Sequence, residues 1–204
     1  MSIDTPAMFI ADAAGLDFLN SVATPASEPV DWIGDGRGLV GWLRQAGLVP
    51  EQQLAAIAAN AIPGELDRVA DQARDLREWF RGFVEKHMGR PLDAGALPEL
   101  VPLNRLLERD EAFGQVVLDR DHLAFESQRR WRSPESLLIP IGEALARVVV
   151  EEDFAEVKAC QGSGCTLLFA DHTRGRARRW CSMGVCGNRA KVAAHRSRQR
   201  IQAS

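Results

Sequence analysis

All four cysteines of this 204-residue chain lie between residues 160 and 186, in two pairs of equal spacing. Four residues separate the members of each pair, Cys160 from Cys165 and Cys181 from Cys186. Thiolates at this spacing suit Zn2+, because each pair can wrap one side of the ion with a single tight turn and two pairs complete a tetrahedron. Glycines inside both turns suit the positive φ that such turns need (Gly162, Gly164 and Gly184).

The alternatives to a metal site are two disulfides or four unrelated thiols of the core. Disulfides suit a secreted chain, and no signal peptide opens this sequence, which lacks a basic region followed by an apolar block. The sequence therefore predicts Zn2+ as the cofactor and all four cysteines as its ligands. His172 and His195 are close by in the sequence, but four cysteines already complete the site, so we interpret both histidines as turn or surface residues.

The residues around the second pair, Trp180 to Lys191 (WCSMGVCGNRAK), resemble the signature of the CGNR-type zinc finger family. The stretch from Cys160 to Asp171 (CQGSGC, then LFAD) fits the same family, and together they cover about a quarter of the chain. In that family the finger ends bacterial proteins described as stress-induced transcriptional regulators, whose N-terminal ABATE domain opens with a segment similar to Gly15–Asn20 (GLDFLN) here. The resemblance implies a zinc-stabilised DNA-binding module behind a larger helical domain.

Charge is divided unevenly along the chain. Residues 158–204 hold ten Lys or Arg and one acid, Asp171, for a net charge of +9, whereas the remainder holds 15 bases and 27 acids, for −12. Four thiolates and one Zn2+ would bring the tail to about +7. An acidic body with a basic end favours a polyanion at that end, and duplex DNA is the partner that we predict. The alternative is a tail that only keeps the body soluble or docks on it.

Nine basic residues of the tail are the predicted DNA contacts. The pattern after Cys186 predicts a helix with a stripe of small residues packed on the zinc knuckle and basic residues elsewhere. Arg suits phosphate through its planar fork. We interpret Asn188 as a cap of this helix in preference to an adenine ligand, and Arg189 as a partner either of a zinc-bound sulfur or of the acidic body. The nine are Arg174, Arg176, Arg178, Arg179, Arg189, Lys191, Arg196, Arg198 and Arg200.

Two strands and a helix are expected to position the zinc site. Residues 166–170 and 178–180 have strand-like patterns, and a turn containing Gly175 joins them. The helix begins at the last ligand, Cys186, where the positive end of the helix dipole favours an ionised thiolate. A cysteine turn, a hairpin and a helix in this order define a treble-clef arrangement.

The rest of the chain predicts a helical body. Helical periodicity marks residues 38–46, 50–61, 65–87, 98–108 and 134–150, while alternation on both sides of residues 119–121 marks a hairpin of 115–118 with 122–127. Periodicity does not decide between helix and strand for 11–22, where we interpret Asn20 as a turn or cap residue. The predicted fold class is α+β, mostly α: a helical ABATE-like domain with a small β-hairpin over 1–155, then a CGNR-type, treble-clef-like zinc finger over 156–204.

These patterns favour one function over two others. No apolar run approaches the roughly 20 residues of a membrane helix, and no Cys, Ser or His pattern makes a nucleophile. We therefore expect a cytoplasmic protein with no membrane partner that is not an enzyme. The leading hypothesis is a zinc-dependent, DNA-binding transcriptional regulator whose N-terminal domain senses a signal or forms a homodimer. The alternative is a zinc-stapled module that binds RNA or protein without sequence-specific DNA contact.

Overall fold

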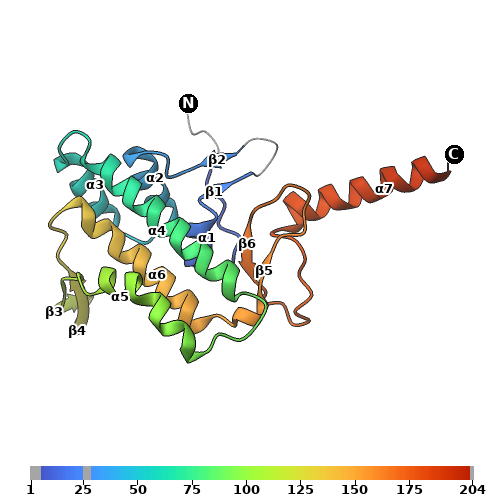
Figure 1. Cartoon of the computed structure of the whole chain (residues 1–204). Helices are drawn as coiled ribbons and strands as arrows, with labels where there is room; N and C mark the ends of the chain where they lie inside the picture. The colour runs from blue at the N-terminus through green and yellow to red at the C-terminus, as the bar shows by residue number, and fades with distance from the viewer. Residues whose placement is uncertain (1–5, 25–28, 203–204) are drawn as a thin grey trace.

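Figure 1 shows a helical body with the cysteine-rich segment at one end, in a computed structural model that describes residues 6–24 and 29–202. The helices of the body are α1 (Ala14–Leu19), α2 (Gly36–Ala46), α3 (Glu51–Asn60), α4 (Glu65–His87), α5 (Val101–Leu107) and α6 (Leu138–Glu151). Antiparallel strand pairs are β1 (Val22–Ala23) with β2 (Val30–Asp31), β3 (Ala112–Asp119) with β4 (His122–Arg129), and β5 (Val157–Ala159) with β6 (Leu168–Ala170). The predicted class, α+β and mostly α, is confirmed.

The longest helices form where periodicity predicts them. α4 spans the predicted range 65–87, because its apolar residues recur on one face, and Val69, Ala73 and Phe80 on that face are fully buried. α2 ends at Gly47, whose φ of 65° provides the left-handed stop that favours glycine. These helices therefore follow from local pattern alone.

Two helices begin differently from the prediction, and proline is involved in both. A 3-10 segment, η1 (Ala94–Leu100), contains Pro98 and precedes α5, while a second, η2 (Pro134–Leu137), precedes α6. Pro140 then lies in the first turn of α6, where backbone N–H groups have no partner within the helix. The helix therefore accommodates this proline without losing a hydrogen bond.

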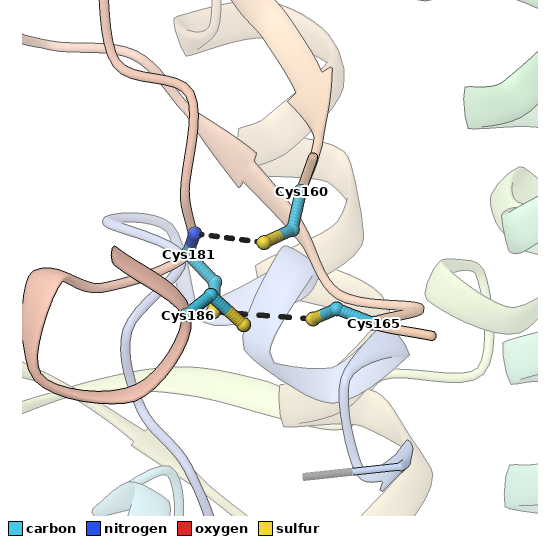
Figure 2. Close-up of side chains that lie close together, drawn as sticks. All are labelled: Cys160, Cys165, Cys181 and Cys186. Atoms are coloured by element: carbon cyan, nitrogen blue, oxygen red, sulfur yellow. Dashed lines mark hydrogen bonds between the residues drawn. The ribbon is translucent and has the colours of Figure 1, made fainter. Parts of the chain in front are cut away.

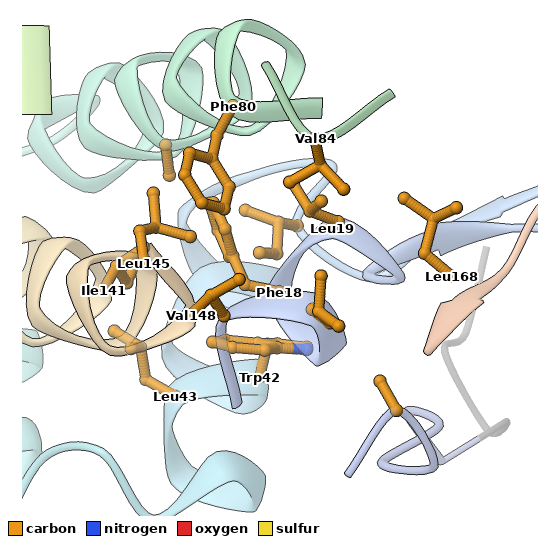
Figure 3. Packing of buried hydrophobic residues seen from close by; sticks show 14 of the residues in the cluster. Phe18, Leu19, Trp42, Leu43, Phe80, Val84, Ile141, Leu145, Val148 and Leu168 are labelled. Atoms are coloured by element: carbon orange, nitrogen blue, oxygen red, sulfur yellow. The ribbon is translucent and has the colours of Figure 1, made fainter. Parts of the chain in front are cut away.

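The segment that periodicity left open forms α1, at the centre of the core. Phe18 and Leu19 are fully buried, and Figure 3 shows them among side chains from α2, α4 and α6. Gly15 lies so close to α6 that a Cβ there would be 2.5 Å from the backbone oxygen of Ala144. Because glycine has no Cβ, the backbone of α1 can contact the backbone of α6, so Gly15 is needed for the packing of these two helices.

The strand pairing in the cysteine-rich segment differs from the prediction. β6 pairs with β5, which lies before Cys160, and not with residues 178–180, which form no strand. The predicted hairpin is therefore wrong, although Arg179 still accepts a backbone hydrogen bond from Gln161 N at 2.9 Å. β5 follows the end of α6 through the short helix η3 (Phe154–Glu156), so the pair joins the body directly to the first cysteine turn.

The last helix, α7 (Asn188–Gln202), extends away from the rest of the molecule (Figure 1). It follows the single helical turn η4 (Met183–Gly187), which carries Cys186. Ala190, the first residue of the predicted stripe of small residues, is half-buried, whereas the side chains of the other stripe positions, 194, 197 and 201, lie outside the described residues. Within the described residues, none of the helices combines the length and apolar character needed to cross a bilayer.

Candidate metal centre

The structure brings all four cysteines together, with their sulfur atoms within 4.8 Å of one another (Figure 2). The Sγ atoms of Cys165 and Cys181 are 4.0 Å apart. Tetrahedral Zn2+ with Zn–S bonds of about 2.3 Å places its sulfurs roughly 3.8 Å apart. Cys160, Cys181 and Cys186 are buried and Cys165 is half-buried. Donor type, donor number and spacing therefore fit Zn2+, which would supply a structural crosslink between the two cysteine turns.

Hydrogen bonds and burial act in opposite directions on these thiols. Burial opposes ionisation of Cys160, but N–H groups of Cys181 (3.2 Å) and Gly162 (3.4 Å) outweigh it and hold the pKa of this thiol below its usual value. Burial, with the neighbouring thiols, raises the pKa of Cys165 to about 11. The same causes raise the pKa of Cys181 well above its usual value. A buried thiol cluster of this kind ionises when a divalent cation compensates its charge, which is the condition for zinc binding.

Two glycines of the first turn have separate roles. Gly164 has a φ of 71° and forms the turn, whereas a Cβ on Gly162 would lie 2.7 Å from the Cys186 sulfur. Gly162 therefore leaves room for the sulfur of the opposite pair, a packing role that the turn argument missed. At the second turn, Ser182 Oγ accepts a hydrogen bond from Val185 N at 3.1 Å. The cap of this helical segment is thus Ser182, six residues before Asn188.

Asn20 fastens this centre to the body. Its side-chain Nδ2 donates to the backbone oxygen of Leu168 at 2.8 Å, and its Oδ1 accepts from Leu168 N at 2.9 Å. Asn20 is 1% exposed and Leu168 is 3% exposed, so water does not compete for either bond. The predicted turn or cap role of Asn20 is therefore incomplete: its side chain satisfies both backbone groups of a β6 residue 148 positions away.

Arg178 makes a second contact between this centre and the body. Its guanidinium donates to the Asp12 carboxylate at 2.5 Å and to the backbone oxygens of Ile10 and Cys181, and it lies 4.2 Å from the centre of the Phe169 ring. Its side chain is only 17% exposed. Arg178 therefore binds the N-terminal segment to the second cysteine turn, and its fork is occupied by protein groups.

Asp171 organises the turn between the two cysteine pairs. This carboxylate, 0% exposed, accepts hydrogen bonds from Lys158 Nζ at 2.7 Å, from Thr173 N at 3.0 Å and Oγ1 at 2.6 Å, and from Arg178 N at 2.9 Å. Burial raises its pKa, but these donors outweigh burial and hold the pKa well below its usual range. The one acid of the basic tail is thus a fully used structural acceptor.

The predicted DNA contacts occupy different settings. Arg189 donates to the Cys186 sulfur at 3.5 Å, which agrees with the first of the two interpretations of this residue, that of a partner of a cysteine sulfur. The side chains of Arg198, Arg200 and His195 lie outside the described residues, while His172 is bound to Glu152 at 2.6 Å and is not part of the cysteine cluster. The predicted DNA contacts whose side chains are exposed at the surface are Arg174, Arg176, Arg179, Arg189, Lys191 and Arg196.

The helical body and the cysteine cluster together define a zinc-finger protein, with Zn2+ as its cofactor. Two family models match the sequence. The ABATE model, described as "Putative stress-induced transcription regulator", matches residues 12–152, and the CGNR zinc finger model matches residues 156–199. The chain belongs to the ABATE family, whose model covers more than half of its length, and it carries a CGNR zinc finger. The comparison with curated proteins gave no match.

The residues that sequence reasoning missed lie in α1 and around it. In the segment GLDFLN, Gly15 allows the close approach of α6, and Asn20 binds the backbone of β6. Asp17 accepts hydrogen bonds from Ile10 N at 2.8 Å and from Ala11 N at 2.9 Å. The signal was present as polar residues inside an otherwise apolar stretch, since such residues are buried only when they are hydrogen-bonded. Their partners could not be read from it.

Asp17→Asn is expected to remove a pH dependence of stability. Burial raises the pKa of Asp17 to about 6, and the two backbone N–H groups offset this only in part. The folded carboxyl therefore keeps its proton to higher pH than the unfolded one, and its contribution to stability falls as pH rises from about 4 to about 6. Asparagine retains the Oδ1 that both N–H groups contact. Urea unfolding should show the variant gaining up to about 3 kcal/mol on the wild type between pH 4 and pH 7.

Asp75→Asn, on the exposed face of α4, is the matched control and should follow the wild type at every pH. A difference between Asp17→Asn and wild type that stays constant from pH 4 to pH 7 would refute the expected protonation of Asp17.

Proposed function

We propose that this zinc-finger protein is a regulator that binds duplex DNA through α7 and the exposed arginines of its finger. The helical domain would sense a signal or form a dimer. The observation that carries the proposal is the position of α7, which leaves the body as a basic helix rooted beside the cysteine cluster (Figure 1). Fifteen residues give a helix of about 22 Å, and the major groove of B-DNA, about 12 Å wide, admits a helix.

Charge supports the same end of the molecule. The segment from 158 to 204 is the basic part of an otherwise acidic chain, and its one acid, Asp171, is fully enclosed. An approaching polyanion therefore meets arginines without an opposing surface carboxylate from this segment. We assign phosphate contact to the exposed residues and assign Arg178 the separate task of holding the finger at a defined angle to the body.

The salt dependence of binding tests this assignment. The double variant Lys191→Ala/Arg196→Ala removes two exposed bases of α7, and each phosphate contact contributes about 0.9 to the slope of log K against log salt. The slope should therefore decrease in magnitude by about 1.8 if both contact phosphate. The measurement is a gel-shift or anisotropy titration at several salt concentrations, with the preferred duplex first selected from genomic fragments.

The matched control is Arg37→Ala/Arg105→Ala, which removes two exposed arginines of the helical body and should leave the slope unchanged. Structured RNA is titrated in parallel. Equal, weak affinity for every duplex would rule against a sequence-specific regulator, and tighter binding to RNA would favour the zinc-stapled RNA module.

A further inference from the structure

The β3–β4 hairpin carries an apolar face that nothing in the described chain covers. Val116 pairs with Phe125 and Leu118 with Leu123, and paired residues of an antiparallel ribbon point to the same side. These four side chains are 62%, 77%, 72% and 75% exposed respectively. They therefore form one continuous patch, which we call the hairpin face, on a ribbon at the end of the molecule away from α7 (Figure 1).

The two sides of the ribbon differ in composition and in burial. Gly114 and Ser127 form the next pair on the hairpin face, so from this pair to the pair of Leu118 and Leu123 the face carries no charge. The opposite side carries polar or charged residues together with apolar ones that are already half-buried: Gln115, Asp119, His122, Glu126 and Gln128 are of the first kind, and Phe113, Val117 and Ala124 are of the second. The apolar residues of the opposite side are therefore partly covered by the protein itself, whereas those of the hairpin face are exposed. An isolated two-stranded hairpin is at best marginally stable in water, so a cover would stabilise it.

The chemistry of the hairpin face restricts what can cover it. It lacks the cations that a nucleic acid or an acidic peptide requires, and it lacks the carboxylates that a basic partner requires. The fitting partner is an equally apolar, uncharged surface, and a second copy of this chain supplies one. Identical faces also satisfy two-fold symmetry, because the same patch is used on both subunits and the contact closes.

The area agrees with a weak dimer. Phe125 contributes up to roughly 150–250 Å2, and with the three smaller aliphatic side chains the hairpin face exposes on the order of 500 Å2 per subunit. Two copies would bury about 1,000 Å2, which lies at the low end for specific complexes. We propose that two chains associate by packing their hairpin faces against each other.

Such a dimer would leave the DNA-binding ends free. Figure 1 places the hairpin and α7 at opposite ends of the molecule, so joining the hairpins puts the two basic helices at the outer ends of the pair. The use of this arrangement for two half-sites rests on the proposed function. The dimer itself does not, because it is measured without DNA.

Sedimentation equilibrium of the full, zinc-loaded chain tests the proposal. The wild-type mass should rise from 22.4 kDa towards twice that value as concentration increases from about 1 to about 100 µM, the range set by so small an interface. The double variant Leu118→Lys/Phe125→Lys should stay monomeric throughout. The control Leu97→Lys/Val150→Lys changes two side chains that are 61% and 77% exposed elsewhere, and it should associate like the wild type.

A charge-complementation arm shows whether the two faces meet. Leu118→Glu/Phe125→Glu should also be monomeric alone, and its equimolar mixture with the lysine variant should form a dimer with a mass near twice 22.4 kDa. A wild type that is monomeric over the whole range, a dimer that survives in the lysine variant, or a mixture that remains monomeric would each overturn the proposal. Failure of DNA binding would leave these masses unaffected.

Discussion

Cys181→Ser is expected to release zinc, unfold the finger and abolish DNA binding. Binding of a structural zinc contributes roughly 10–16 kcal/mol to the folding of a small finger, and a site with three thiolates loses most of it. Cys181 is 0% exposed and belongs to the same hydrophobic core as α1 and α6, so the body is affected as well. The midpoint of thermal unfolding should fall by on the order of 10 °C. Elemental analysis after dialysis, thermal unfolding and a DNA titration measure the three effects.

The control is Ser163→Ala, an exposed position in the first cysteine turn, which should retain one zinc per chain, the wild-type midpoint and full binding. Removal of zinc from the wild type by a chelator should reproduce the variant, and added zinc should reverse it. A Cys181→Ser protein whose tail stays folded and binds DNA unchanged would contradict the assignment of this cysteine as a ligand.

Asn20→Ala is expected to lower the free energy of unfolding by about 3 kcal/mol. The substitution removes two hydrogen bonds and leaves the N–H and C=O of Leu168 buried without their partner, and each such loss costs roughly 1–3 kcal/mol. Because β6 leads away from the cysteine turn and is held on α1 by this contact, the finger should also lose its fixed placement on the body. Denaturant unfolding measures the first effect, and faster hydrogen exchange of the Leu168 amide measures the second.

Asn60→Ala is the matched control, since its exposed amide donates only to the preceding turn of its own helix at 2.8 Å. It should change stability by less than about 0.5 kcal/mol. If the two substitutions cost the same, the contact between Asn20 and β6 contributes nothing beyond loss of an amide.

Zinc ligation and the longest helix could be predicted because both depend on spacing along the chain. Ligands five positions apart meet around an ion whenever their turn is tight, and α4 forms wherever an apolar stripe recurs with the helical period. The charge of the tail is likewise a property of composition. Cofactor, fold class and family were therefore accessible before any coordinates, and the structure and family models agree with all three.

The partners of individual side chains were not accessible in this way. Residues 178–180 looked like the second strand of a hairpin, yet β6 pairs with β5, since strand propensity does not name a partner. Arg178 looked like one more arginine for DNA, but it binds Asp12, 166 positions earlier. Contacts of this range exist only after the core has formed and excluded water, and no local pattern encodes them.

The sequence by itself determined that this chain binds zinc through a clustered cysteine site and that its basic charge lies at one end. Only the tertiary structure decided how that end is placed: the Asn20 and Arg178 contacts fix the finger on the body, while α7 extends away from it. The physical reason is the separation along the chain over which each interaction acts. Metal ligation and helical periodicity act over a few residues, whereas burial depends on which distant segments share one core.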